Sequence, residues 1–191
     1  MADHTHVLGI CGSLRRGSYN RMALEAARWL APAGMTIEPF EALRDIPPYD
    51  GDLESAGFPP VVQDLRARIK AADALLLVTP EYNYSVPGVL KNAIDWASRP
   101  PEQPFEGKPA AIMSAGPGMF GGVRCQYHLR QCFVYLDAKI LNRPEVFINN
   151  APKKFAEDGT LNDEGTAKAI GGLLEALKVW TVRLKGSSPQ H

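Results

Sequence analysis

Short apolar runs alternate along the chain with longer segments in which apolar residues recur every three or four positions. The run Ala74–Val78 is apolar throughout, which is typical of a central strand that is covered on both faces. Residues 61–72 instead carry Val62, Leu65 and Ile69 on one side of a helix. The pattern predicts strands at 7–11, 36–40, 74–78, 110–114 and 139–141, the last continued by 145–148, and helices at 19–30, 61–72, 89–97, 123–136 and 162–184.

The alternation of strands and helices is typical of an α/β fold with parallel strands. Five such units predict a doubly wound five-stranded parallel sheet of flavodoxin-like type, with strand order 2-1-3-4-5 and helices on both faces. Neither a solenoid-length repeat nor a linker interrupts the pattern. We therefore expect a single domain over residues 1–191, with an ordered core at about 6–185 and a loose tail at 186–191.

Composition excludes several classes of protein. With 45% apolar and 22% charged side chains, the 191 residues can form a compact core, which excludes disordered and collagen-like chains. Lys and Arg together number 21, as do Asp and Glu, so the formal net charge is zero. The chain lacks the basic excess that attracts nucleic acids, and it lacks the acidic excess of an electron carrier that docks on basic partners.

The chain start and the cysteines bear on location. Residues 1–6 lead directly into a strand-like run with no signal-peptide pattern, and no apolar run approaches the ~20 residues that span a bilayer. Cys11, Cys125 and Cys132 form no disulfide framework, which favours a reducing compartment. We expect a cytoplasmic protein with no membrane and no nucleic-acid partner.

Three loops leave the carboxyl ends of the predicted strands, at 12–18, 79–88 and 115–122. In a doubly wound sheet the ligand site lies outside these ends, where the strand order reverses. We therefore expect a functional site where the three loops converge.

The first loop and the helix start that follows it, residues 12–20, have the features of an anion cradle. Glycines permit a tight turn, and the backbone N–H groups at the start of a helix favour a negative ligand. Ser13, Ser18 and Asn20 can donate hydrogen bonds, and either neighbouring arginine can add a charge-assisted one. The loop predicts a site for a phosphate monoester.

Residues 12–17 also match the G-x-x-x-x-G of a P-loop. A P-loop is disfavoured, because Ser18-Tyr19 stands where that motif has Lys followed by Ser or Thr. The alternative that stays open is that the two serines only cap the helix and that Arg15 and Arg16 are solvated.

The second loop, Pro80-Glu81-Tyr82-Asn83-Tyr84-Ser85-Val86-Pro87-Gly88, is suited to a planar heterocycle. Its two tyrosines offer flat amphipathic faces, and its asparagine and backbone amides can bond ring carbonyls and nitrogens. An aromatic-rich turn without a ligand is the alternative.

The third loop, Gly116-Pro117-Gly118-Met119-Phe120-Gly121, matches the G-x-G-x-x-G fingerprint of dinucleotide binding. It follows the fourth predicted strand rather than the first, and no acidic strand end follows about 20 residues later. We favour a loop that brings backbone close to a flat ligand, with direct dinucleotide binding as the alternative. Cys125, His128 and Cys132 would spread over ~10 Å of one helix, so we expect no metal site.

Together the segments resemble the NADPH-dependent FMN reductase family of flavodoxin-like proteins, and within it the bacterial quinone/chromate reductases. The similarity covers about residues 7–184, and the segment 79–88 is its specific signature. The matching segments are Gly-Ser-Leu-Arg-Arg-Gly-Ser-Tyr-Asn (12–20), Thr-Pro-Glu-Tyr-Asn-Tyr-Ser-Val-Pro-Gly (79–88), Leu-Lys-Asn-Ala-Ile-Asp-Trp (90–96) and Gly-Gly-Val-Arg-Cys-Gln-Tyr-His-Leu-Arg-Gln (121–131).

This resemblance implies an FMN site. The first loop would hold the phosphate, the second would contact the isoalloxazine and ribityl chain, and Gly116 would approach the ring. The implied cofactor-binding residues are Ser13, Leu14, Arg15, Arg16, Gly17, Ser18, Tyr19, Asn20, Pro80, Glu81, Tyr82, Asn83, Tyr84 and Gly116.

By the same resemblance, Arg124, Tyr127 and Glu145 form a subunit-contact network, which implies a homodimer or homotetramer. One departure is Ala115-Gly116-Pro117, where we expect Ser or Thr in relatives. It bears on local hydrogen bonds to the flavin and not on the fold.

The implied activity is two-electron, ping-pong oxidoreduction. NADPH or NADH would pass a hydride to FMN and leave, and a quinone or similar acceptor would then take both electrons. The cofactor carries this chemistry, so we expect no catalytic residue. Two alternatives stay open: a one-electron carrier like flavodoxin, which the missing acidic surface disfavours, and a non-catalytic flavin-binding sensor module.

Overall fold

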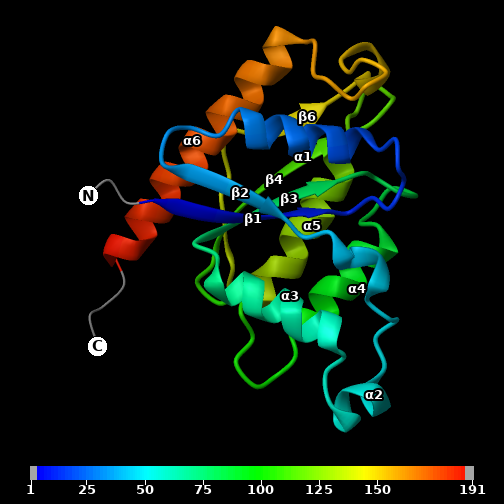
Figure 1. Cartoon of the computed structure of the whole chain (residues 1–191), viewed down its shortest axis with the longest axis vertical. Helices are drawn as coiled ribbons and strands as arrows, with labels where there is room; N and C mark the ends of the chain where they lie inside the picture. Colours follow the sequence, from blue (N-terminus) through cyan, green and yellow to red (C-terminus); the bar gives the residue numbers. More distant parts are fainter. Residues whose placement is uncertain (1–3, 188–191) are drawn as a thin grey trace.

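A computed structural model describes residues 4–187 and shows a parallel sheet between two layers of helices (Figure 1). The strand order β2-β1-β3-β4-β5 confirms the predicted topology, and β6 also pairs with β4. All the strand pairs are parallel. The strands are β1 (Thr5–Cys11), β2 (Met35–Pro39), β3 (Ala74–Thr79), β4 (Pro109–Ala115), β5 (Lys139–Ile140) and β6 (Val146–Ile148).

Helices cover both faces of this sheet. Helices α1 and α6 lie on one side, whereas α3 and α4 lie on the other with α5 (Figure 1). The helices are α1 (Tyr19–Trp29), α2 (Gly51–Ala56), α3 (Pro60–Ala71), α4 (Gly88–Ala97), α5 (Val123–Tyr135) and α6 (Glu164–Ser187), with short 3₁₀ turns η1 (Ala42–Asp45) and η2 (Ala151–Lys153).

The central strand β3 contributes side chains to the hydrophobic cores on both faces of the sheet. Successive side chains of a strand point to opposite faces. Ala74, Leu76 and Val78 therefore pack with α1 and α6, while Leu75 and Leu77 pack with α3, α4 and α5. Every residue of β3 is buried, as its continuous apolar run predicts.

Some boundaries differ from the sequence-based expectation. The fifth strand position is divided between β5 and β6, with Pro144, which has no N–H to donate to a ladder, in the interval. The helix α2 was not predicted, because none of its six residues is buried and it carries no apolar stripe. Helix α6 continues through Ser187, two residues into the expected tail, and residues 188–191 lie outside the described part.

The sheet register brings the three loops together. Cys11 at the end of β1 is paired with Val78 of β3, and Thr79 at the end of β3 is paired with Ser114 of β4. The loops that follow these three adjacent strands therefore leave from the same edge of the sheet. In the described part of the chain, no helix is both long enough and apolar enough to cross a membrane.

Candidate functional site

A cavity of about 590 Å³ lies at this edge, with residues of all three loops in its wall. Its size is in the range of small-molecule and cofactor sites, about 300–1,000 Å³. It is lined by Ser13, Arg15, Ser18, Tyr19, Asn20, Pro80, Glu81, Tyr82, Ala115, Gly116, Pro117, Gly118, Phe120, Gly121, Gly122 and Arg124.

The first loop contributes two buried hydroxyls to the wall. Ser18 is the N-cap of α1, and its Oγ accepts hydrogen bonds from the backbone N–H groups of Asn20 (3.2 Å) and Arg21 (3.4 Å). The cap uses the lone pairs of the oxygen, so the hydroxyl hydrogen of Ser18 remains available as a donor. Ser13 is buried beside it in the same wall. The capping role and the anion-binding role of Ser18 are therefore compatible.

Asn20 connects the first loop to the third. Its side-chain Nδ2 donates to the carbonyl of Ala115, and its Oδ1 accepts from the N–H of Ala115, both at 2.9 Å. The amide thereby satisfies both backbone groups at the end of β4 in a buried environment. Its side chain lines the cavity but is engaged with the protein backbone, so we assign it to holding the two loops together.

The two arginines of the first loop, Arg15 and Arg16, line different cavities. Arg15 lines the cavity, and its guanidinium lies 5.4 Å from the centre of the Tyr19 ring. Arg16 and Gly17 are absent from this wall and line a different cavity. Leu14 packs against the core on the α3 side, and its carbonyl accepts a hydrogen bond from Arg44 (2.8 Å).

The second loop folds back on itself as a tight turn. The N–H groups of Tyr82 and Ser85 each donate to the carbonyl of the other residue, at 3.1 and 3.0 Å. The residues between them, Asn83 and Tyr84, have φ values of 47° and 71°, the left-handed conformation that such turns require. Pro80, Glu81 and Tyr82 line the cavity, whereas these two turn residues do not.

Glu81 is fixed by the start of α5. Gly122 precedes that helix and offers no side chain to cap it. Instead, Oε2 of Glu81 accepts from the backbone N–H groups of Arg124 (3.1 Å) and Cys125 (3.3 Å), while Oε1 pairs with Nη2 of Arg124 at 2.5 Å. A carboxylate at a helix N-terminus is stabilised by the helix dipole. Hydrogen bonds to Tyr84 and Glu81 raise the pKa of Arg124 further above its usual range.

A buried polar network supports the third loop. Gly121 and Gly122 have φ values of 55° and 86°, and a Cβ on Gly122 would lie 2.8 Å from the Cβ of Ser114. Ser114 Oγ donates to the carbonyl of Gly121 (2.6 Å) and accepts from Nε2 of Gln126 (2.8 Å). Gly121 and Gly122 are therefore required by their positive φ and by the close approach of neighbouring atoms, whereas a Cβ on Gly118 would meet no neighbouring atom within 4 Å.

Sequence reasoning missed several wall residues. The cavity is also lined by Phe120, Gly121, Gly122 and Arg124. The sequence predicted the first three only as members of the third loop, and Arg124 only as a subunit contact. Their signal was the glycine pair Gly121-Gly122, because adjacent glycines before a helix indicate a loop that approaches neighbouring atoms closely.

The residues expected at a subunit contact lie on and beside α5. The hydroxyl of Tyr127 donates to Oε1 of Glu145 (3.0 Å), and this hydrogen bond raises the pKa of Tyr127. Arg124 instead contacts Glu81, Tyr84 and Phe120 of its own chain. The structure describes one chain, so the predicted contact between subunits stays a prediction.

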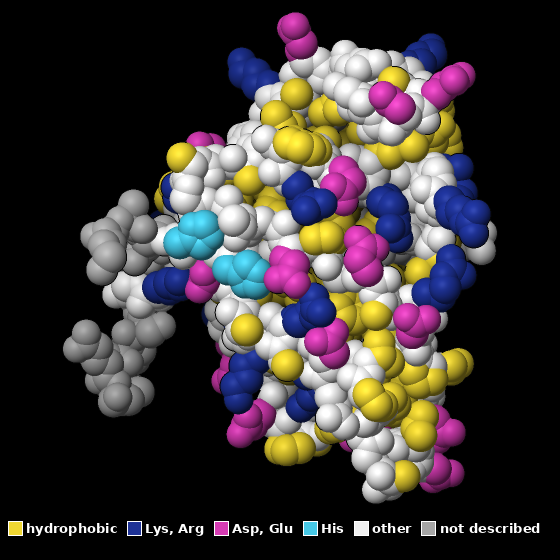
Figure 2. All heavy atoms as spheres, in the orientation of Figure 1, with side chains coloured by type: hydrophobic (Ala, Val, Ile, Leu, Met, Phe, Trp, Pro, Cys, Tyr) yellow, Lys and Arg dark blue, Asp and Glu magenta, His cyan; other side chains and the backbone are white. Residues whose placement is uncertain are grey.

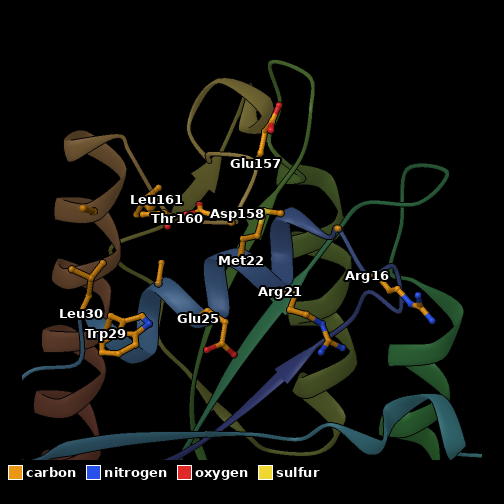
Figure 3. Close-up of a pocket in the computed structure, with 14 residues that line it drawn as sticks. Arg16, Arg21, Met22, Glu25, Trp29, Leu30, Glu157, Asp158, Thr160 and Leu161 are labelled. Atoms are coloured by element: carbon orange, nitrogen blue, oxygen red, sulfur yellow. The ribbon is translucent and has the colours of Figure 1, made fainter.

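A second, larger cavity of about 820 Å³ lies between α1 and the segment 157–161 (Figure 3). Met22, Trp29 and Leu30 come from the helix and its end, and Leu161 comes from the opposite segment. Two of the cavity's charged side chains form ion pairs, Arg21 with Glu41 and Glu25 with Arg28. Neither the second nor the third loop reaches this cavity, so we place the chemistry in the smaller one.

Neither the surface charge nor a metal cluster indicates a second functional site in the described residues. On the face shown in Figure 2, acidic and basic side chains are interspersed, in keeping with the zero net charge. No group of three His, Cys, Asp or Glu residues within 4–187 is arranged to hold a metal ion.

Comparison with known proteins identifies the family. The model of the family described as NADPH-dependent FMN reductase matches residues 5–153, which include all three loops. The chain belongs to this family. The resemblance inferred from the loop motifs is confirmed, and the chain is an oxidoreductase.

Similar proteins extend the match over nearly the whole chain. An NAD(P)H-dependent FMN reductase of Pseudomonas aeruginosa is 56% identical, covering 97% of this chain and all of that protein. A quinone reductase of Escherichia coli is 44% identical with the same coverage of each chain. Among solved structures, the flavoenzyme NAD(P)H:(acceptor) oxidoreductase FerB of Paracoccus denitrificans is 36% identical, with a TM-score of 0.86 over 94% of this chain and 98% of FerB.

Proposed function

We propose that this family member is an FMN-dependent NAD(P)H:quinone oxidoreductase, with FMN bound in the 590 Å³ cavity. The observation that carries the proposal is the polarity of that cavity. One end presents buried hydroxyls, an arginine and a helix N-terminus, and the other presents glycine backbone and aromatic rings. The names of the P. aeruginosa and E. coli relatives support the same activity.

The first-loop end fits a phosphate monoester. Ser13 and Ser18 are buried donors, Arg15 supplies a positive charge, and α1 begins at the same place, with the partial positive charge of a helix N-terminus. Helix N-termini and charge-assisted donors are the usual means of holding phosphate in proteins.

The opposite end fits a flat ring system. The backbone of Gly116 and Gly118 lies in the wall with no side chain to keep a planar ligand away, and Tyr82 and Phe120 border the opening. The N–H of Gly116 is already bonded to Ile148, which fixes the strand end that supports the loop. The expected Gly116 contact with the ring therefore remains part of this proposal.

The protein's share of the reaction is binding and orientation. FMN, when bound, supplies two-electron transfer between NAD(P)H and a quinone. The carboxylate in the described wall, Glu81, is held by Arg124 and by two backbone N–H groups, so it acts in structure rather than as a proton carrier. Such a site would raise the reaction rate by holding the substrate in near-attack geometry.

Assembly and location are part of the same proposal. Tyr127, Val134 and Tyr135 leave an exposed apolar surface on α5, which supports a homodimer or homotetramer. The cysteines of the described chain are unpaired, which supports a reducing compartment such as the cytoplasm. Light scattering on the purified protein gives the mass of the assembly.

The activity is tested with purified protein loaded with FMN under anaerobic conditions. Addition of NADPH or NADH should bleach the flavin absorbance, and a subsequent quinone should restore it without net loss of flavin. A flavin that stays oxidised under an excess of both nucleotides would exclude the reductase activity.

A further inference from the structure

At the open end of the cavity, one arginine lies against two aromatic rings. The guanidinium carbon of Arg124 lies 3.9 Å from the ring centre of Tyr84 and 4.8 Å from that of Phe120. The same guanidinium pairs with Glu81 at 2.5 Å. Stacking and ion pairing together fix the position of a side chain that is otherwise flexible.

Both members of this pair face the cavity. Glu81 and Arg124 line it, with side chains 11% and 32% exposed. The two backbone N–H groups that bond Glu81 keep the carboxylate in place beside the arginine. Among the described lining residues, the remaining charged side chain is Arg15, which belongs to the first loop at the other end.

The pairing leaves the open end of the cavity electrically neutral. An isolated positive charge at partly exposed positions attracts anions over several ångströms, and an isolated negative charge repels them. With both charges in contact, an incoming molecule meets flat aromatic rings and a cancelled charge. Such a surface favours uncharged planar molecules.

We propose that the Glu81–Arg124 pair determines which acceptors the enzyme reduces, by selecting uncharged quinones over anionic ones. This inference rests on the proposed function, since it concerns the acceptor that enters the same cavity. Loss of either member exposes the charge of the other, so the two losses change acceptor preference in opposite directions.

The test uses FMN-loaded wild type, Glu81→Gln, Arg124→Gln and the double variant, with menadione as the neutral acceptor and a naphthoquinone sulfonate as the anionic one. Gln at position 81 keeps an oxygen that can accept from the α5 N–H groups. The measured quantity is the ratio of kcat/KM for the sulfonate to that for menadione. Dissociation constants of both quinones for the oxidised protein, by calorimetry, give the corresponding ratio of affinities without turnover.

We expect the ratio to rise about tenfold in Glu81→Gln and to fall by about the same factor in Arg124→Gln at low ionic strength. Both changes should shrink in about 0.5 M salt, and the double variant should return close to the wild-type ratio. Glu38→Gln is the matched control, because Glu38 also pairs with an arginine, Arg68 at 2.7 Å, but on β2 outside the cavity. It should leave the ratio unchanged.

Opposite shifts in the two single variants support the proposal. Unchanged ratios, or shifts of the same sign in both variants, would overturn it, because only packing would then have changed. A wild-type protein that reduces neither quinone would instead overturn the proposed function, and this inference with it.

Discussion

The two ends of the cavity differ in how the protein holds them. At the first-loop end, Ser13, Ser18 and Asn20 are only 3%, 2% and 3% exposed. At the open end, Tyr82 and Phe120, which line the cavity, are 49% and 54% exposed. One end is part of the folded core, and the other presents half-exposed aromatic rings at the surface.

This difference separates two tasks. A group that stays bound through many turnovers gains from buried donors that are already in position, since little ordering remains to be done on binding. Substrates that enter and leave in turn need an accessible apolar surface instead. Changes at the first end should therefore affect folding and cofactor affinity, whereas changes to the exposed rings at the open end should affect substrate binding and turnover.

The largest expected effect is the loss of the link between the two loops. Asn20→Leu removes both hydrogen bonds to Ala115 and leaves a buried N–H and C=O unsatisfied, so unfolding free energy should fall by about 3 kcal/mol. Urea denaturation of the apoprotein measures it. Asn92 makes a matching pair of bonds, to Tyr49 and Pro47, at a less buried position, so Asn92→Leu should cost less. Equal losses of unfolding free energy in Asn20→Leu and Asn92→Leu would show that the deeper burial of Asn20 does not matter.

Next comes the positive charge at the phosphate end. Arg15→Gln should weaken FMN binding about tenfold to a hundredfold, because a charge-assisted hydrogen bond is lost, while stability stays within about 0.5 kcal/mol. Titration of apoprotein with FMN, followed by quenching of flavin fluorescence, gives the affinity. The adjacent Arg16, which does not line this cavity, provides the control. If Arg16→Gln weakens binding as much as Arg15→Gln, the assignment of Arg15 is wrong.

The layer beneath the open end should respond to alkaline pH. Burial raises the pKa of Cys125 to about 11 from 9.0, and its Sγ lies 3.6 Å from Oγ1 of Thr79. The folded state thus favours the neutral thiol, so its stability is fully present below pH 9 and is lost as the pH rises toward 11, by up to about 2 kcal/mol. Cys125→Ala should flatten this decline relative to wild type in urea titrations at several pH values. If the unfolding free energies of wild type and Cys125→Ala decline in parallel with pH, the raised pKa of the buried thiol is contradicted.

The smallest effect on stability is expected at the open end. Met119→Ala and Phe120→Ala remove exposed side chains, so unfolding free energy should change by less than about 0.5 kcal/mol. KM for menadione should still rise severalfold in Phe120→Ala, because Phe120 lines the cavity and Met119 does not. Steady-state kinetics compares the two variants. A large loss of stability in either would erase the distinction between the two ends.

Much of this arrangement could be predicted from local sequence pattern. The apolar run of β3 and the helical stripe at Val62, Leu65 and Ile69 determine the layers, and parallel strands place the three loops at one edge. The role of Ser18 follows from its position before a helix.

Contacts between distant segments could not be predicted in this way. Asn20 meets Ala115 across 95 positions, and Glu81 meets the start of α5 across 43. Their side chains suggested ligand contacts, because sequence alone does not show which backbone groups lie opposite. Asn83 and Tyr84 were likewise expected to contact the flavin. They form the tight turn and do not line the cavity, although the Tyr84 ring packs on Arg124, which does, so their contact with the flavin stays a prediction.

The central claim is that the first-loop end recognises the phosphate of FMN. Its most direct test is the affinity of apoprotein for FMN compared with riboflavin, which has the same ring and chain but no phosphate. We predict one-to-one binding of FMN at least about a hundredfold tighter than riboflavin, consistent with two or more charge-assisted bonds to the phosphate. Equal affinity for the two flavins, or no binding of either, would contradict the account.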